Sequence, residues 1–349
     1  MTEVRGLRIA VCLPQVPFER GGAEVLADNL VHELCGRGHD AILVTVPYRW
    51  YPDHQLLENM LLWRLLDLDR GERPPDLVIG TKFPSYLVQH PKKVVWLFHQ
   101  FRQAYDMHGT GFAQFADDAH GAAMRQAIRR ADHEALSEAT AVLTISANTA
   151  ERLRAFNGID AEVFYPPPQF HDLECLGDDG TVLSVGRLDP AKRTDLLIRA
   201  LARVPGGRAT IIGDGNDRAR LEQIARDAGV GDRVAFLGRV DDQTLRDAYG
   251  RCRCVYYAPV DEDFGMVTVE AHLAAKPVLT TTDAGGVLEF VEDGRTGLVV
   301  TPDVDGITTG LARLLADAKF AGELGRAGQA AAGALGWDEV IDRLLAVAA

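Results

Sequence analysis

The sequence predicts an α/β protein with two doubly wound parallel sheets. Short apolar runs alternate with helical segments along both halves of the chain. The runs are apolar throughout, which is typical of parallel strands covered by helices on both faces. The chain has 349 residues, and this length exceeds what a single core usually supports, so we expect two domains.

The first half contains the strands of one sheet. In chain order the apolar runs are LRIAVCL, DAILVTV, DLVIG, KKVVWLF and AVLTIS. The segment AEVLADNLVHELCGRG, between the first two runs, has helical periodicity and ends at a glycine. This order of elements predicts a doubly wound first domain.

The second half repeats this pattern. Its predicted strands are TVLSVG, RATIIG, RVAFLG, CVYYA, PVLTT and GLVV, and its helices include TDLLIRALARV, DRARLEQIARDAG and DDQTLRDAYG. The prolines of YPPP (165–168) can continue neither a helix nor a central strand. We therefore expect domains at 1–168 and 169–335. The segment 336–349 is one helix more than the second domain needs, and we expect it to pack back on the first.

Composition excludes several classes of protein. A net charge of −13 disfavours a nucleic-acid partner. The five cysteines form no disulfide framework, and Cys252 and Cys254 lack the further ligands of a zinc site. LRIAVCL has the pattern of a buried strand and not of a signal sequence, and no apolar run reaches the length of a membrane span. We expect a cytoplasmic protein.

The turns between strands and helices are the candidate sites, because doubly wound domains bind ligands at the carboxyl ends of their strands. Gly21 and Gly22 precede a helix, where backbone N–H groups favour an anion; the alternative is a turn needed only for chain geometry. Arg187 and Lys192 flank the turn in SVGRLDPAKRTDLL. In an acidic protein this pair indicates a diphosphate clamp more than a solvated surface pair.

The stretch DEDFGMVTVEA (261–271) places carboxylates on both sides of a helix start. If the helix begins near Phe264 or Gly265, its free N–H groups lie between Glu262 and Glu270. A sugar, a diphosphate and a ribose in succession would fit this layout, which is the shape of a nucleotide-sugar. The letters D-x-D within this stretch do not indicate a metal site, because they precede the helix that carries Glu270. We expect no metal.

Four segments together resemble glycosyltransferase family 4, a family of retaining enzymes with the GT-B fold: GGAE, VGRLDPAKRTDLL, EDFGMVTVE and KPVLTTTDAGGVLEFVEDGRTGLVV. The resemblance is dense over the second domain and sparse over the first. It implies Rossmann-like domains facing across a cleft, with 1–168 binding the acceptor and 169–335 binding the donor. It also implies retaining transfer of a hexosyl group, without cofactor or metal, from GDP-mannose or a UDP-sugar to a glycan or lipid-linked acceptor in bacterial polysaccharide or glycoconjugate biosynthesis.

The resemblance also implies roles for single residues. Arg187 and Lys192 would hold the diphosphate and stabilise the departing nucleotide, Glu262 would bind the transferred sugar, and Glu270 would hold the ribose hydroxyls. Further donor contacts would come from Gly21, Gly22, Val240, Phe264, Gly265, Met266 and Val267.

His99 follows the strand VVWLF, and family members often place a histidine near the reacting sugar at such a position. We therefore group His99 with Arg187, Lys192 and Glu262 as catalytic candidates; the alternative is a structural imidazole. Three neighbours of His99 are acceptor candidates: Arg102, Tyr105 and Asp106.

Other functions remain open from the sequence: a sugar phosphorylase, a nucleotide-sugar-binding module without turnover, and an NAD-dependent oxidoreductase, the last weakened by the absence of G-x-G-x-x-G. Weak peripheral contact with the inner face of the plasma membrane is a further expectation. The stretch RWYPDHQLLENMLLWRLLDLD could lie at an interface, but its polar positions are mostly acidic, which favours core packing. Residues 1–165 carry 17 Lys and Arg against 21 Asp and Glu.

Overall fold

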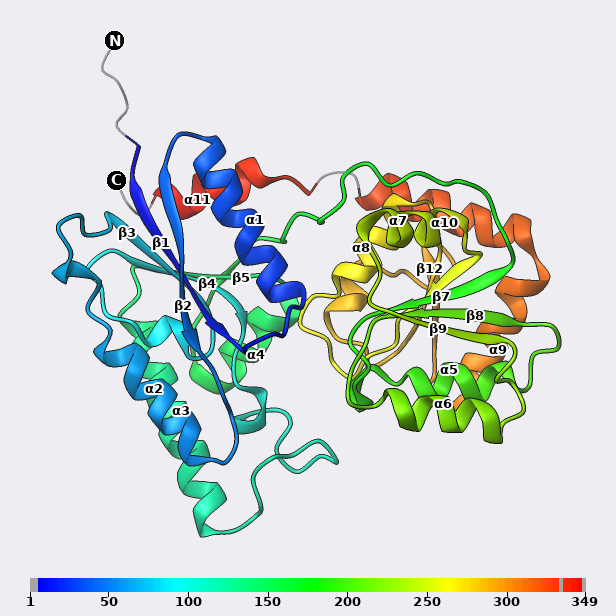
Figure 1. Ribbon diagram of the computed structural model, residues 1–349, viewed down its shortest axis with the longest axis horizontal. Coiled ribbons are helices and arrows are strands. Elements are labelled where there is room, and N and C mark those ends of the chain that lie inside the picture. The colour runs from blue at the N-terminus through cyan, green and yellow to red at the C-terminus, as the bar shows by residue number, and fades with distance from the viewer. Residues whose placement is uncertain (1–5, 333–334, 347–349) are drawn as a thin grey trace. The chain divides into compact units, whose positions relative to one another are not determined.

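The chain divides into two compact units (Figure 1). The computed structural model describes residues 6–332 and 335–346. Unit 1 comprises Met1–Pro167 and Gly336–Ala349, and unit 2 comprises Pro168–Leu335. Within the ranges predicted as domains, residues 1–5, 333–334 and 347–349 lie outside the described residues.

Unit 1 is built on a six-stranded parallel sheet with the order β2-β1-β3-β4-β5-β6. Its strands are β1 (Arg8–Gln15), β2 (Asp40–Pro47), β3 (Leu77–Lys82), β4 (Lys93–His99), β5 (Ala141–Thr144) and β6 (Glu162–Val163). The five apolar runs predicted as strands are confirmed. The strand β6 was not predicted, since two residues give no periodic signal.

The helices of unit 1 come from both ends of the chain. They are α1 (Gly22–Gly36), α2 (His54–Leu65), α3 (Ala119–Ser137), α4 (Ala147–Asn157) and α11 (Trp337–Ala346). In α11 the indole of Trp337 meets that of Trp96 edge-on at 6.1 Å, and Arg343 forms an ion pair with Glu162. These contacts attach the last described helix to the sheet of unit 1.

Unit 2 contains the second six-stranded parallel sheet, with the order β12-β11-β10-β7-β8-β9. Its strands are β7 (Thr181–Val185), β8 (Arg208–Ile212), β9 (Val234–Gly238), β10 (Cys254–Tyr256), β11 (Val278–Thr281) and β12 (Gly297–Val300). All six correspond to predicted runs. The predicted α/β class with two doubly wound sheets is confirmed.

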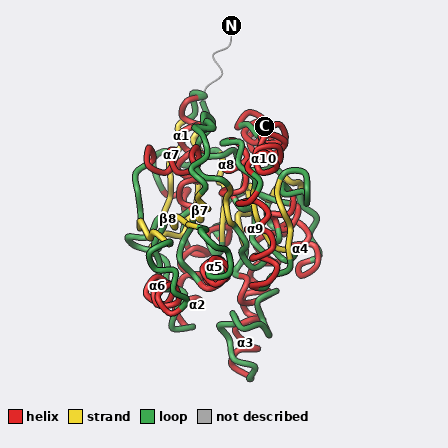
Figure 2. The backbone as a smooth tube through the Cα atoms, turned by 90° about the vertical axis from the view of Figure 1, so that its right-hand side faces the viewer, coloured by secondary structure: helices red, strands yellow, loops and turns green. Residues whose placement is uncertain are grey.

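Helices cover both faces of this second sheet (Figures 1 and 2). They are α5 (Thr194–Leu201), α6 (Arg218–Asp227), α7 (Asp242–Arg251), α8 (Met266–Leu273), α9 (Val304–Ala316) and α10 (Ala318–Ala332). Leucines and isoleucines of α5, α6 and α9 fill the core on one face, and α7 and α8 contribute to the core on the other. Among the described residues there are also short 3-10 turns at Leu68–Arg70, Ser85–Leu87, Arg102–Ala104, Pro190–Lys192 and Gly286–Glu289.

The strand orders define where each sheet can bind a ligand. In unit 2, successive strands continue outward from β7 through β8 on one side and from β10 through β11 on the other. In unit 1 the same reversal separates β1 from β3. Ligands of doubly wound sheets bind at this switch point, outside the carboxyl ends of the strands. The turns after β7 and β10, and those after β1 and β3, therefore position the candidate sites.

A carboxylate lies buried in the core of unit 1. Asp132, on α3, has no exposed surface. Its Oδ1 accepts a hydrogen bond from the hydroxyl of Tyr86 at 2.9 Å, and its Oδ2 accepts one from Tyr105 at 2.8 Å. Burial raises the pKa of Asp132 to about 7, although hydrogen bonds from the two tyrosines act in the opposite direction.

The raised pKa of Asp132 gives a testable dependence of stability on pH. The folded protein binds this proton more tightly than the unfolded chain, so this carboxyl makes the free energy of unfolding fall as the pH rises from about 4 to about 7. Asp132→Asn carries no such proton. Its free energy of unfolding should therefore fall less steeply with pH than that of the wild type, by up to about 1.4 kcal/mol per pH unit. Urea unfolding of both proteins between pH 4.5 and 7.5 measures the difference, and parallel slopes would contradict it.

Candidate active site

The turn after β7 carries two predicted cations. The carboxylate of Asp189 accepts a hydrogen bond from the N–H of Ala191 at 3.0 Å and so caps the 3-10 turn that ends at Lys192. Arg187 is exposed, and no hydrogen bond or ion pair ties its guanidinium to any other described residue. The turn thus fixes the backbone at Lys192 while Arg187 can engage a ligand.

The turn after β10 holds Glu262 by its backbone. The N–H of Glu262 donates to the carbonyl of Ala284 at 3.0 Å, and its carbonyl accepts from the N–H of Gly286 at 2.8 Å. These bonds form a parallel bridge between Glu262 and Gly285, in line with the carboxyl edge of the sheet. Glu262 is therefore fixed at the switch point beside the turn after β7.

Lys192, Glu262 and Tyr257 meet in a polar cluster in unit 2. The ammonium of Lys192 forms an ion pair with Oε2 of Glu262 and donates to the hydroxyl of Tyr257 at 3.3 Å. That hydroxyl donates in turn to Oε2 of Glu262 at 3.1 Å. Burial disfavours the ammonium, but the Glu262 carboxylate outweighs it and raises the pKa of Lys192. Lys192 is thus cationic throughout the neutral range.

A small pocket opens at the carboxyl end of β7. Its lining includes the side chains of Arg187, Lys192 and Tyr257. The structure therefore brings together both cations that the sequence predicted. It adds Tyr257, which could not be selected from the sequence because it lies in an apolar run that has the pattern of a strand.

Arg193 ties the turns around this pocket together. Its guanidinium donates to the carbonyls of Ala258 at 2.8 Å and Pro259 at 2.6 Å. It also forms an ion pair with Asp283 at 2.7 Å and donates to Thr281 at 2.9 Å. This role was not predicted, since the partners of Arg193 lie some distance away along the chain.

Helix α8 begins at Met266, one residue after Gly265, the later of the two predicted starts. Gly265 caps it with φ 88°, in the left-handed region. The helix geometry leaves the N–H groups of Met266 and Val267 without partners inside the helix, whereas Thr268 donates back to the carbonyl of Gly265 at 2.9 Å. The first turn of α8 therefore presents donors and the positive end of the helix dipole.

Gly265 should resist replacement for two reasons. Its φ belongs to a region that other residues enter at a cost of about 1–2 kcal/mol, and an added Cβ would lie 2.8 Å from Cγ2 of Val287. We expect Gly265→Ala to lower the free energy of unfolding by about 2 kcal/mol or more. Gly206→Ala is the matched control, with φ 72° and open space around an added Cβ. Equal losses in both variants would show that the contact with Val287 contributes nothing.

Glu270 lies in α8 and is 6% exposed. Its Oε2 accepts a hydrogen bond from the hydroxyl of Tyr249 at 2.8 Å. Burial raises the pKa of Glu270 to about 7, against the opposing effect of that hydrogen bond. This carboxyl is not the solvent-facing acid of an ordinary helix surface. Val240, the predicted base contact, is half-buried against the same core as Tyr249.

The switch point of unit 1 holds an ion pair that the sequence did not indicate. Oε2 of Glu24 accepts from the N–H of Gly21 at 2.8 Å, and Oε1 pairs with the ammonium of Lys82 at 2.5 Å. Burial opposes the charge on Glu24, but Lys82 and the Gly21 N–H together lower the pKa of this carboxyl. Gly21 and Gly22 remain exposed at the start of α1. The turn after β1 is therefore fixed to the end of β3.

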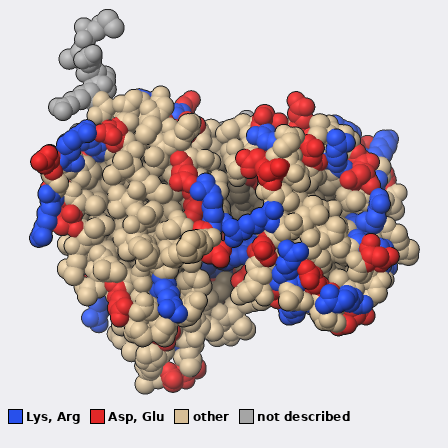
Figure 3. Space-filling model, viewed as in Figure 1, with Lys and Arg blue, Asp and Glu red and all other residues tan. Residues whose placement is uncertain are grey.

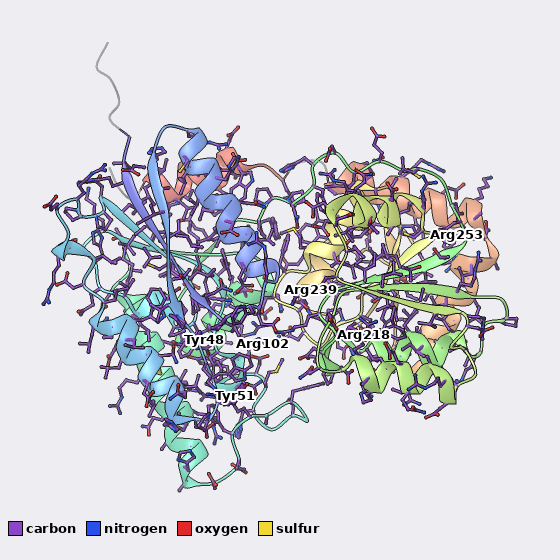
Figure 4. All side chains as sticks on the ribbon, in the orientation of Figure 1. Tyr48, Tyr51, Arg102, Arg218, Arg239 and Arg253 are labelled. Carbon is purple, nitrogen blue, oxygen red and sulfur yellow. The ribbon has the colours of Figure 1, made fainter. Side chains whose placement is uncertain are left out.

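The predicted residues after β4 lie in different surroundings. His99 ends β4 half-buried, with Nδ1 3.0 Å from the carbonyl oxygen of Gln100. Arg102, labelled in Figure 4, donates from Nε to Asp106 at 2.9 Å. Tyr105 is 2% exposed and its hydroxyl is bonded to Asp132. The prediction of Tyr105 as an acceptor contact is therefore wrong, because its side chain belongs to the core.

Two properties of the described residues bear on the class of site. Between residues 6 and 332, and again between 335 and 346, no group of three or more His, Cys, Asp or Glu side chains is arranged to hold a metal ion. Over the same ranges, no helix has both the length and the apolar character that crossing a membrane requires.

Comparison with known sequences gives a family match. The profile of the family described as "Glycosyl transferases group 1" matches residues 169–331. The D-inositol 3-phosphate glycosyltransferase of Mycobacterium avium (strain 104) is 35% identical over 199 residues, which are 54% of this chain and 47% of that protein. The chain thus spans about half the length of this curated relative.

One relative aligns over most of both chains. The GDP-mannose-dependent alpha-(1-6)-phosphatidylinositol monomannoside mannosyltransferase of Mycolicibacterium smegmatis is 27% identical over 352 residues, 90% of each chain. Among solved structures, sucrose-phosphate synthase from Thermosynechococcus elongatus superposes with a TM-score of 0.81 at 20% identity, covering 98% of this chain and 100% of that one. The likeness shows that the chain has the GT-B fold.

Proposed function

We propose that the chain is a member of the glycosyl transferases group 1 family, whose profile matches residues 169–331, and that it transfers a hexosyl group from a nucleoside diphosphate sugar to a hydroxyl of a glycan or lipid-linked acceptor. The observation that carries this proposal is the grouping of Lys192, Glu262 and Tyr257 at the switch point of unit 2. This arrangement combines a fixed cation with a carboxylate on the same edge of the sheet as the first turn of α8. These groups suit a diphosphate that carries a sugar.

The donor would be held by groups of unit 2. We place the diphosphate against Lys192, Arg187 and the N–H groups of Met266 and Val267, since all of these are positive or are donors. Glu262 would accept hydrogen bonds from the sugar hydroxyls. Glu270, of which only Oε2 is bonded to a described residue, would accept from the ribose through Oε1.

The proposed reaction retains the configuration at the anomeric carbon. The bond between this carbon and the diphosphate oxygen breaks as a bond to the acceptor oxygen forms on the same face. The acceptor's proton passes to the departing phosphate oxygen. Lys192 stays protonated, because its pKa is raised, and it stabilises the charge that develops on this leaving group. No metal is needed for that role.

Unit 1 would bind the acceptor. We retain His99 as its catalytic candidate, since it ends β4 at the carboxyl edge of the sheet. Arg102 and Asp106 remain acceptor candidates as an ion-paired unit. Gly21 and Gly22 would let a phosphate or sugar approach the start of α1 closely.

The printed names of the relatives guide the choice of substrates. One relative is GDP-mannose-dependent and acts on a phosphatidylinositol monomannoside, and another is a D-inositol 3-phosphate glycosyltransferase. We therefore propose GDP-mannose as the first donor to test and UDP-sugars as the second. The acceptor would be an intermediate of bacterial polysaccharide or glycoconjugate biosynthesis.

The test measures release of the nucleoside diphosphate from GDP-mannose, UDP-glucose and UDP-N-acetylglucosamine. Each donor is offered with phosphatidylinositol monomannoside or with inositol phosphate, in EDTA. We expect one donor to give nucleoside diphosphate and an α-linked product by NMR. Sugar phosphate formed from a disaccharide and inorganic phosphate, with no nucleotide requirement, would favour a phosphorylase instead.

A further inference from the structure

We propose that Tyr257 is a catalytic residue whose hydroxyl, together with the ammonium of Lys192, holds the phosphate oxygen that leaves the sugar. In the structure the carboxylate of Glu262 occupies this two-donor site. When the donor binds, Glu262 gives the site up to the diphosphate. This role rests on the proposed function, in which Tyr257 makes no contact with the donor.

Two hydrogen-bond donors converge on one oxygen atom in this site. The ammonium of Lys192 and the hydroxyl of Tyr257 both donate to Oε2 of Glu262. The hydroxyl lies 3.1 Å from that oxygen and 3.3 Å from the ammonium nitrogen. Converging donors of this kind stabilise an oxyanion. Carboxylate and phosphate oxygens accept the same charge-assisted bonds, so Oε2 of Glu262 stands where a phosphate oxygen would bind.

Both donors of the site keep their protons at neutral pH. Burial, and after it the carboxylate of Glu262, raises the pKa of the Tyr257 hydroxyl above its ordinary value. Burial disfavours the ammonium of Lys192, but Glu262 outweighs it and raises that pKa as well. Tyr257 therefore acts as a hydrogen-bond donor and not as a base that removes the acceptor's proton.

The two-donor site lies beside the start of α8. A Cβ added to Gly265 would lie 3.3 Å from Cε1 of Tyr257, the ring atom next to the carbon that bears the hydroxyl. Glycine at 265 thus lets the ring edge approach the first turn of α8, which presents the N–H groups of Met266 and Val267. Donors from the turn after β7, the end of β10 and the start of α8 meet here.

A broad positive surface does not explain phosphate binding on this unit. Over much of the face of unit 2 that Figure 3 shows, Lys and Arg side chains are interspersed with Asp and Glu. The chain as a whole has a net charge of −13. A phosphate is therefore recognised through a few donors that converge at one point, and each of them should matter measurably.

Glu262 can leave the site without a change in the backbone. Its N–H and carbonyl stay bonded to Ala284 and Gly286. Its side chain is 21% exposed, and that of Lys192 is 23% exposed, so the pair borders solvent. Rotation about the side-chain bonds of Glu262 would carry the carboxylate to the sugar hydroxyls. The vacated position would then receive the phosphate oxygen.

The hydroxyl of Tyr257 acts while the sugar is transferred. As the bond from the anomeric carbon to the phosphate oxygen breaks, its electron pair stays on that oxygen. Lys192 and Tyr257 both donate to this oxygen and keep their own protons. The acceptor's proton passes to the departing phosphate. Because the negative charge grows during the reaction, the bond from Tyr257 is stronger in the transition state than with the bound donor.

The first test is the rate of transfer by Tyr257→Phe, which removes only the hydroxyl. We expect kcat to fall by about 10- to 100-fold, the usual effect of a bond to a charged group, and the KM of the donor to change less. Tyr256→Phe is the matched control. Tyr256 is also buried, and its hydroxyl donates to the backbone carbonyl of Arg193 at 2.8 Å. It should keep the wild-type kcat, and both variants should keep the melting temperature.

The second test measures binding of GDP, UDP, GMP and UMP by calorimetry, without transfer. Tyr257→Phe should weaken the preferred diphosphate and leave its monophosphate unchanged, since only the diphosphate carries the oxygen that Tyr257 holds. Glu262→Gln competes less for the site and should bind the diphosphate more tightly than the wild type. Adding Tyr257→Phe to Glu262→Gln should still weaken it. No further loss in that double variant would show that Tyr257 acts only by holding Glu262.

The outcomes separate this role from the proposed function. Sugar transfer by the wild type with the same kcat in Tyr257→Phe would refute the role of Tyr257 alone. Equal weakening of diphosphate and monophosphate would also refute it, because a structural effect does not distinguish the two. If the wild type transfers no sugar from any donor, the proposed function fails and the catalytic role of Tyr257 fails with it, whatever the binding data show.

Discussion

Replacing Lys192 by methionine is expected to lower kcat for sugar transfer by about 100- to 1,000-fold. Methionine keeps much of the length of the side chain but cannot donate to an oxyanion. Removal of one preorganised donor of this kind typically costs two to three orders of magnitude in rate. The side chain of Lys192 is cationic at neutral pH, because Glu262 raises its pKa. Release of nucleoside diphosphate under saturating donor measures the change.

The control for this prediction is Lys319→Met. Lys319 is exposed on α10, and its ammonium lies 3.9 Å from the carboxylate of Glu323. The control variant therefore also loses a lysine–glutamate ion pair, but outside the candidate site. Lys319→Met should keep the activity of the wild type. Lys192→Met activity within about fivefold of the wild type, with the fold intact by melting temperature, would remove Lys192 from the proposed mechanism.

Glu270→Ala is expected to weaken binding of the nucleoside diphosphate by about 10- to 100-fold. A hydrogen bond to a charged group contributes about 1.5–3 kcal/mol, and each 1.4 kcal/mol is a factor of ten. Calorimetric titration of wild type and variant with the same nucleotide measures the loss. Equal dissociation constants would show that Glu270 serves the core through Tyr249 and does not contact the ligand.

The pH dependence separates these two roles of Glu270 further. The carboxylate accepts from ribose hydroxyls when it is ionised, and burial raises its pKa to about 7. Nucleotide affinity should therefore increase as the pH rises from about 6 to about 8. Glu270→Gln cannot ionise and should show a flat profile over this range. A rise of equal size in this variant would assign the dependence to another group.

The sequence was informative about the fold because the strands are continuous apolar runs. All eleven predicted runs are strands in the structure. Strands of a parallel sheet are buried on both faces and are therefore apolar throughout, which distinguishes them from the segments around them. The strand β6 was missed because its two residues are too few to show a period.

The site was predictable where its residues follow one another along the chain. The start of α8 could be placed because glycine precedes an apolar helix at 265. Lys82 and Arg193 were missed because their partners are far away in sequence: Glu24 in one case and Asp283 in the other. Tyr105 was misassigned because nothing near it in sequence reveals Asp132.

The most direct measurement is the thermal stability of the wild type and of Lys192→Met with GDP, UDP, ADP and the corresponding monophosphates. A diphosphate present at 100 times its dissociation constant should stabilise the wild type by about 2.7 kcal/mol. We predict that one diphosphate does so, that its monophosphate does so less, and that Lys192→Met loses most of the effect. Failure of every nucleotide to stabilise the wild type, or an equal shift in Lys192→Met, would contradict a nucleotide-sugar site at the switch point of unit 2.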